Sequence, residues 1–456
     1  MISTFFGLEI ARRGILAERT AMDTVAHNLA NTNTEGYTRQ EAVRAATPPY
    51  TFPTREQRVI PGQLGTGVEI STIRRIRDEL LDKQLRNAMG EAGFWEERED
   101  ALSRVEAIFP EPTEQGLQGL IGKFFNNWHE LNNSPQDLGL KAAVRVAGEE
   151  LTVAVRQAYG QLKDNERNLR ELAQDQVDKI NSIAEEISGL NQRIQHLIRM
   201  GTQPNDLMDR RDVLLDQLGT IGTETVERFS DGTISVSLFG QELIREDGTY
   251  ETVSIQAPFG GPSDSLVLSF SSGATVDITA AANAYSQSGS LVGIESSRQK
   301  VKEYMTDLDE LANAIRDEVN TAHGSDFFDT ASVGAADFDL SDAVKADLNN
   351  IDGTRALAVA GLRDDLIMAG GTATFEGFYR QLVTRIGEDM RGSGERTTGA
   401  QAVREQLQKL RESVSGVSVD EELTKLTQYQ YAFQACSRVI TIIDDMLDTL
   451  INRMLR

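Results

Sequence analysis

Apolar residues recur every seven positions near both ends of the chain. At the N-terminal end the repeat predicts an amphipathic helix over residues 3–30, capped by Ser3 or Thr4 and ended by the Asn- and Gly-rich stretch 31–36. One row of the repeat comprises Leu8, Ile15, Met22 and Leu29, and the companion row comprises Phe5, Ala11 and Val25. Such a stripe predicts that one face of the helix packs against a partner.

The same repeat is longer over residues 418–456. One row comprises Val419, Leu426, Phe433, Ile440, Leu447 and Met454, and the row three positions further on comprises Tyr429, Cys436, Ile443 and Leu450. Periodicity sustained over this length is typical of a coiled coil. The N-terminal helix is the expected partner, although Glu18 interrupts its companion row.

Between the ends, the pattern predicts a body of long helices, with only ten prolines to interrupt them. The longest helix is expected to begin at Ser134, as a cap followed by Pro135, and to continue to Gly201. Further helices are expected at 74–108, 113–131, 206–218, 294–322, 374–391 and 398–413. Residues 324–373 are rich in Gly, Ala, Asp and Asn, which indicates irregular structure with one short helix.

Residues 223–290 alternate with a period of two around two Asp-Gly pairs, Asp231-Gly232 and Asp247-Gly248. This pattern indicates β-hairpins. The expected fold class is therefore mainly α with a β-rich insert, an α+β chain of discontinuous domains. Residues 1–42 and 418–456 form a terminal polymerisation region of paired coiled-coil helices, 43–222 and 291–417 a long-helix body, and 223–290 a β-rich outer unit. Whether that unit is a separate domain or part of the body core stays open.

Charge is unevenly distributed along the 456 residues. The net charge is −24, and about −21 of it lies between residues 43 and 417. This acidity argues against nucleic acid or an anionic membrane as a partner. No stretch approaches 18 apolar residues, so no membrane-spanning helix is expected. The start, MISTFFG, lacks a basic leader, and Glu9 and Arg12 break its apolar run, so no cleaved secretory signal peptide is expected.

Catalytic patterns are absent from the sequence. No HExxH, GxSxG, P-loop or paired cysteines occur, and Cys436 is the single cysteine, so no internal disulfide can form. The glycines Gly62, Gly65 and Gly67 precede the strand-like residues 68–72, and they predict a turn rather than a phosphate-binding loop. We therefore expect no enzyme activity and no cofactor.

Two acidic groups are candidates for binding a metal. His323 lies near Asp326 and Asp329, but a polar turn at a helix end explains this group more simply. Asp206, Asp209 and Asp212 are spaced by three, which favours helix capping and an ion pair between Asp206 and Arg210 over a cation site. We expect no metal.

Several stretches resemble the first hook-associated protein family of bacterial flagella, and they occur in the family's order. They are HNLANTNTEGYTRQ at 27–40, GTGV at 65–68 with IRRIRD at 73–78, PNDLMDRRD at 204–212, and SGVSVDEE at 415–422 leading into QYQ and AFQA. Glu35 departs from the proline usual in this family, and the chain is short after Gly324, where relatives often insert an outer domain.

The resemblance implies a structural subunit that joins the flagellar hook to the filament. The implied partners are the hook protein, a second hook–filament junction protein, identical copies in a ring, an export chaperone and the type III export apparatus. The implied location is extracellular, at the hook–filament junction. A hook or rod subunit is the alternative, because such proteins share the Asn-rich N-terminal motif.

The candidate assembly interface combines both heptad rows with the N-terminal motif. It comprises Leu8, Ile15, Met22, Leu29, Asn28, Asn31, Gly36, Tyr37, Val419, Leu426, Tyr429, Phe433, Ile440, Ile443, Leu447, Leu450 and Met454. Burial of the large C-terminal residues contributes roughly 12–24 kcal/mol, whereas ordering costs about 1–2 kcal/mol for each residue's backbone. We therefore expect the ends to fold fully only on assembly.

Overall fold

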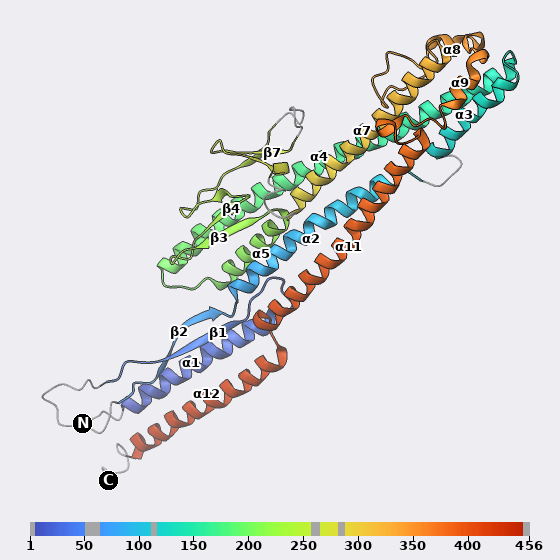
Figure 1. Ribbon diagram of the computed structural model, residues 1–456. Helices are drawn as coiled ribbons and strands as arrows, with labels where there is room; N and C mark the ends of the chain where they lie inside the picture. Colours follow the sequence, from blue (N-terminus) through green and yellow to red (C-terminus); the bar gives the residue numbers. More distant parts are fainter. Residues whose placement is uncertain (1–4, 51–63, 111–115, 257–264, 281–287, 450–456) are drawn as a thin grey trace.

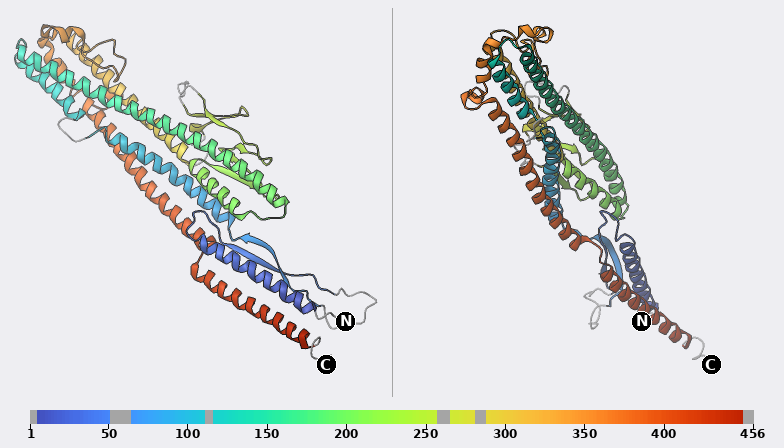
Figure 2. Two further views of the ribbon diagram at one scale, coloured as in Figure 1. Left: turned by 180° about the vertical axis from the view of Figure 1, so that it is seen from behind. Right: turned by 90° about the vertical axis from the view of Figure 1, so that its right-hand side faces the viewer.

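The computed structural model describes residues 5–50, 64–110, 116–256, 265–280 and 288–449. They form one elongated molecule built mainly of long helices (Figure 1). Helix α1 (Phe5–Ala30) and helix α12 (Val419–Asp448) lie side by side at one end (Figure 1, Figure 2). The expected pairing of the terminal helices is therefore confirmed. The expected cap at Ser3 or Thr4 lies outside the described residues.

The body is a bundle of long helices. They are α2 (Glu79–Glu106), α3 (Leu117–Asn133), α4 (Leu138–Arg199), α5 (Asn205–Ile221), α7 (Ser290–His323) and α11 (Phe375–Ser415). Helix α2 packs along α11, α7 and α5, and α4 packs along α7, α3 and α5. The mainly helical fold class is confirmed.

Helix α4 has the expected length but a different start. Its cap is Asp137, whose carboxylate accepts hydrogen bonds from the backbone N–H groups of Gly139 (2.7 Å) and Leu140 (3.2 Å). Ser134 instead ends α3, so the expected cap was wrong. The apolar stripe of its second half is buried, namely Ile180, Ile183, Ile187, Leu190 and Ile194.

Helix α11 is a single helix where two were expected. Its glycines lower intrinsic helix stability, by about 1 kcal/mol each. Packing on α2 compensates: Ser393, Thr397 and Ala400 are buried, and Arg404 pairs with Glu96 of α2 at 3.0 Å. Tertiary contacts therefore override the local break signal.

The strands form three small antiparallel sheets. The first pairs β1 (Gln40–Ala46) with β2 (Val68–Arg75), and this hairpin occupies the first residues of the segment expected to be helical from residue 74. The second contains β3 (Glu224–Arg228), β4 (Ile234–Leu238) and β5 (Gln241–Ile244), and the third β6 (Val253–Ile255), β7 (Val267–Phe270) and β8 (Thr275–Asp277). The β-rich character of 223–290 is confirmed, whereas β1 was not expected.

One face of this β-rich segment packs on α4. Ile234, Val236 and Leu238 are fully buried in the same hydrophobic cluster as the α4 stripe. Asn191 of α4 donates a hydrogen bond to the carbonyl of Ile234 at 2.8 Å, and Asn181 bonds the backbone of Val253 in both directions. The strands therefore share their core with the body.

The tip opposite the terminal helices is closed by residues 324–373. They form α8 (Asp342–Ala346), α9 (Ala356–Gly361), α10 (Met368–Gly371) and two 3-10 turns, more helix than expected. An aromatic cluster fills this end and contains Phe124, Trp128, Phe327, Phe328 and Phe338. No helix in the described part of the chain is long and apolar enough to cross a membrane.

Candidate assembly interface

Helices α1 and α12 run antiparallel and approach closely. A Cβ atom added at Gly14 would lie 2.9 Å from the Sγ of Cys436, and one added at Gly7 would lie 3.2 Å from the Cδ1 of Ile443. Such separations are shorter than ordinary van der Waals contact, so a larger residue does not fit at Gly14 or Gly7 unless α12 shifts. The buried residues of α1 are Ala11, Gly14, Ala17, Glu18, Ala21, Thr24, Val25 and Asn28.

The contact row of α1 therefore lies beside the row that the heptad pattern indicated. Leu8, Ile15, Met22 and Leu29 are half-buried, and the row one position earlier contains the closely approached Gly7 and Gly14. Large apolar residues carry the periodic signal, whereas close approach of two helices selects small ones. In the companion row Ala11 and Val25 are buried and Phe5 is exposed.

Helix α12 is only partly covered. Leu426, Tyr429, Phe433, Cys436, Ile440, Ile443 and Leu447 are half-buried, and Glu422 is the single buried residue of the helix. Val419, expected in the seam, is exposed, and the polar Glu422 takes the first seam position. Leu450 and Met454 lie outside the described residues.

A second apolar row on α12 was missed. Tyr431, Val439, Ile442 and Met446, which we call the outer stripe, are all exposed. Val439, Ile442 and Met446 are 45%, 56% and 53% exposed. The spacing of three and four residues between Val439, Ile442 and Met446 was a usable signal, but this row runs beside the stronger heptad rows.

The Asn-rich motif forms the centre of the joint between the terminal helices and the body. Asn28 is fully buried and uses both ends of its amide. Its Nδ2 donates to the Gln40 carbonyl and to Oε2 of Glu422, each at 2.9 Å. Its Oδ1 accepts from the Tyr37 hydroxyl at 2.8 Å and the Gln40 backbone N–H at 3.0 Å. The structure thus links the two terminal motifs directly.

The turn at 31–37 needs its glycine. Gly36 has φ +75°, in the left-handed region that favours glycine, and an added Cβ would overlap a methyl group of Val213 in α5. Asn31 donates to the His27 carbonyl at 3.0 Å. Burial and the nearby charges of Asp206, Asp209 and Glu422 raise the pKa of Tyr37, which keeps its hydroxyl protonated as a donor.

Residues of the 73–78 and 204–212 motifs meet in a cluster of buried ion pairs at the joint between the terminal helices and the body. Asp212 of α5 accepts from Arg75 at the end of β2 (2.6 Å), from Arg77 just after it (2.8 Å) and from Arg228 of β3 (3.2 Å). Burial acts to raise the pKa of Asp212, but the three guanidinium charges outweigh it and lower the pKa below its usual range. Asp209 pairs with Arg75 at 2.8 Å and accepts from the Thr38 N–H.

The three aspartates of the 206–212 group, weighed for metal binding, therefore have protein partners. Asp206 accepts from Gln40 at 2.9 Å and faces His27 at 3.3 Å. The expected Asp206–Arg210 pair is wrong, because Arg210 reaches Glu186 of α4 instead, at 2.8 Å. No group of His, Cys, Asp and Glu residues within the described ranges has the arrangement of a metal site.

His323 ends α7 next to the left-handed Gly324. Its Nε2 accepts from the Asp352 N–H at 2.9 Å, and burial lowers its pKa, which favours the neutral ring. The polar-turn interpretation accounts for this geometry. Gly67 has positive φ, at 110°, and directly precedes β2, while the carbonyls of Leu64 and Gly67 accept from the N–H groups of Tyr50 and Thr47. Gly62 lies outside the described residues, so the expected turn before the strand at 68 stays a prediction.

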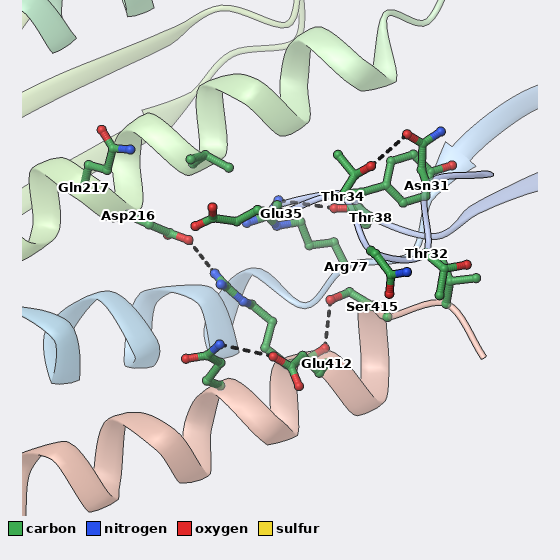
Figure 3. A pocket seen from close by; sticks show the side chains of 18 of the residues that line it. Asn31, Thr32, Thr34, Glu35, Thr38, Arg77, Asp216, Gln217, Glu412 and Ser415 are labelled. Carbon is green, nitrogen blue, oxygen red and sulfur yellow. Dashed lines mark hydrogen bonds and ion pairs between the residues drawn. The ribbon is translucent and has the colours of Figure 1, made fainter. Parts of the chain in front are cut away.

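A cleft of about 450 Å³ lies where the 31–38 turn, α5 and the end of α11 meet (Figure 3). Arg411 of α11, which lines the cleft, pairs with Asp216 of α5 at 2.5 Å. Next to the cleft, Arg39 donates its backbone N–H to the Ser415 carbonyl at 2.8 Å, and its side chain pairs with Glu421. These contacts attach the start of α12 to both the body and the hairpin.

Three family models match separate parts of the chain. Residues 102–338, half of the chain, match the flagellar hook-associated protein FlgK helical domain. Residues 8–38 match the flagella basal body rod protein, and 411–454 match the flagellar basal body rod FlgEFG protein C-terminal region. The ends are thus of a kind found in several flagellar proteins, and the helical middle separates this chain from hook and rod subunits.

Full-length relatives agree with the match to the middle. The chain is 28% identical to flagellar hook-associated protein 1 of Bacillus subtilis, over 100% of this chain and 99% of the relative. It is 22% identical to the protein of that name from Salmonella typhimurium, over 97% and 98%.

The fold also matches a solved structure, that of the flagellar hook junction protein FlgK from Burkholderia pseudomallei. The TM-score is 0.62 at 14% identity, covering 73% of this chain and 100% of that one. The helical body, the terminal helix pair and these matches together show that the chain belongs to the FlgK family of flagellar hook-associated proteins, a structural and not an enzymatic family of the extracellular hook–filament junction.

Proposed function

We propose that this chain assembles through α1 and α12 into a ring of identical copies, with the hook protein on one side and a second hook–filament junction protein on the other. The observation that carries this proposal is the incomplete covering of α12. Its seam residues are only half-buried against α1, and the outer stripe beside the seam is exposed, with Val439 at the edge of an apolar pocket that Gly7, Gly14 and Cys436 also line.

Neighbouring subunits gain from covering the outer stripe. Full burial of one large apolar side chain contributes roughly 1.5–3 kcal/mol. About half of each side chain is already covered, so burying Val439, Ile442 and Met446 contributes roughly 2–5 kcal/mol per subunit. The near-neutral charge of both ends suits repeated contacts, because like charge does not accumulate at the interface.

The exposed apolar surface also has a consequence before assembly. Contiguous exposed apolar residues favour unwanted association. We infer that an export chaperone covers α12 in the cell and that the chain leaves through the flagellar type III apparatus. The predicted domain division follows the same logic, with 1–42 and 418–456 as the polymerising part and the remainder as an acidic body in contact with water.

The outer stripe can be tested by a single substitution in cells that lack the natural chain. Ile442→Glu places a charge where a neighbour is expected, so we expect the chain to fold and be exported but not to join hook to filament, leaving flagellin unpolymerised in the medium. Val153→Glu is the matched control, because Val153 is equally exposed on α4 of the body. Normal filaments with Ile442→Glu would refute the proposed interface.

A further inference from the structure

The glycine contacts between α1 and α12 repeat without a distinctive feature, and at the next layer Arg44 of β1 pairs with Glu18 at 2.9 Å and lies over the Tyr429 ring at 4.6 Å from its centroid. Gly7 faces Ile443, Gly14 faces Cys436, and Asn28 bonds Glu422, so each step of seven along α1 matches a step of seven back along α12. The first two layers on α1 are glycines, which present no side chain for shape matching. A shift of α12 by seven residues would therefore leave similar apolar contacts in place.

The layer formed by Asn28 and Glu422 differs from the others. Both residues are fully buried, and the Asn28 amide is fixed within its own segment by Tyr37 and the Gln40 backbone. One oxygen of Glu422 accepts from Lys425 of its own helix at 2.7 Å, and the other accepts from Asn28. The side-chain amide of Asn28 is thus a rigidly held hydrogen-bond donor at one position along the contact between α1 and α12.

We propose that the Asn28–Glu422 pair sets the register of α12 against α1. A shift of α12 by one repeat away from the body would place Glu422 opposite Ala21 and leave Asn28 beyond the start of the helix. The carboxylate would then be buried without its donor on α1, which is costly in a low-dielectric seam. A single buried polar residue is known to specify register in coiled coils at a cost in stability.

The connection between α11 and α12 is the competing explanation. Only residues 416–418 separate the two helices, and Arg39 holds both the Ser415 carbonyl and Glu421. A shift by seven residues moves α12 by about 10.5 Å, which unwinding of its first turns can supply. The test must therefore separate the polar pair from this tether. It concerns a single chain and does not depend on which surface neighbours occupy.

Cys436 provides the reporter. A Cβ added at Gly14 would lie 3.8 Å from the Cβ of Cys436, the usual spacing in a disulfide. Gly14→Cys therefore reports the native register, and Gly7→Cys reports a shift of one repeat. In the otherwise natural full-length chain, oxidation should cross-link Gly14→Cys efficiently and Gly7→Cys at least about tenfold less.

The decisive variant is Asn28→Leu with Glu422→Leu, which replaces the polar layer by apolar residues. We expect the Gly7→Cys cross-link to rise about tenfold relative to Gly14→Cys, with unchanged circular dichroism of the body. Glu422→Gln in the chain with natural Asn28 keeps a hydrogen-bond acceptor for Asn28. It should show the cross-link pattern of the natural register, with Gly14→Cys favoured over Gly7→Cys. If the double variant does not fold, Glu422→Leu alone repeats the test. An unchanged cross-link pattern would overturn the proposal, since the short connection between α11 and α12 would then set the register. Loss of both cross-links would also overturn it, since the polar pair would then hold the two helices together without selecting a register.

Discussion

Substitution of Asp212 by alanine tests whether the buried ion cluster holds the joint together. The change leaves Arg75, Arg77 and Arg228 without their shared carboxylate. Removing one partner of a buried ion pair typically costs 3–5 kcal/mol. Arg75 keeps Asp209 and Arg77 keeps Asp82, so we expect the lower end, about 3 kcal/mol.

Urea unfolding followed by tryptophan fluorescence measures this cost, because Trp95 and Trp128 are both buried in the body. With a slope of roughly 3 kcal/mol per molar urea, the midpoint should fall by about 1 M. Arg210→Ala is the control, since its pair with Glu186 is exposed on both sides and should contribute less than about 1 kcal/mol. Equal midpoints for the two variants would refute the reasoning.

The same comparison has a defined pH dependence. The folded-state pKa of Asp212 is lowered, so the carboxylate stabilises the fold fully above the pKa of an unfolded aspartate, about 3.9. The stabilisation is lost as the pH falls from there toward the folded-state pKa. The difference in unfolding free energy between the natural chain and Asp212→Ala should therefore be constant from about pH 5 to 8 and shrink below about pH 4. A difference that grew on acidification would contradict the assigned charge state.

Three further outcomes are expected. Phe433→Asp puts an unpaired charge in the seam at a cost of several kcal/mol, and we expect a folded body that forms no filament junction in complementation assays; normal filaments would count against the seam. Gly36→Ala places a side chain in a left-handed turn and against Val213, so it should lower the free energy of unfolding by about 1–3 kcal/mol. Gly160→Ala is the control, because Gly160 lies in open space on α4, and it should be neutral or stabilising by up to about 1 kcal/mol. Thermal unfolding measures both. Limited proteolysis of the monomer should remove residues 1–40 and 418–456 before the body; ends as resistant as the body would disprove coupled folding.

Much of the fold could be predicted because long periodic stripes determine it. The isoleucines of α4 and the heptad rows of α12 are local patterns, and helix geometry alone places each on one face: the α4 stripe is buried and the α12 rows are half-buried except for the exposed Val419. The ends of the helices were harder to predict, because they depend on tertiary contacts. Helix α11 continues across its glycines because Ser393 and Thr397 pack on α2. Strand β1 was missed because its partner β2 lies over twenty residues further along the chain.

The interface was predictable in its location and less so in its details. The sequence motifs located Asn28 and Tyr37, but the bond from Asn28 to Glu422 joins residues 394 positions apart, and no local pattern reports it. The contact row on α1 consists of Gly7, Gly14, Ala21 and Asn28, small or polar residues that carry little apolar signal. The acidic triplet at 206–212 was expected to cap a helix and to pair Asp206 with Arg210, but Arg210 pairs with Glu186 and the helix has no side-chain cap. The arginine partner that Asp209 and Asp212 share, Arg75, comes from a distant segment.

A density map of the assembled hook–filament region containing this chain tests the central claim most directly. The account predicts that α1 and α12 of each subunit pair antiparallel, with Asn28 against Glu422, and that Val439, Ile442 and Met446 of each subunit are covered by a neighbouring terminal helix. A map in which the outer stripe faces solvent while body domains make the contacts between subunits would contradict assembly through the terminal helices.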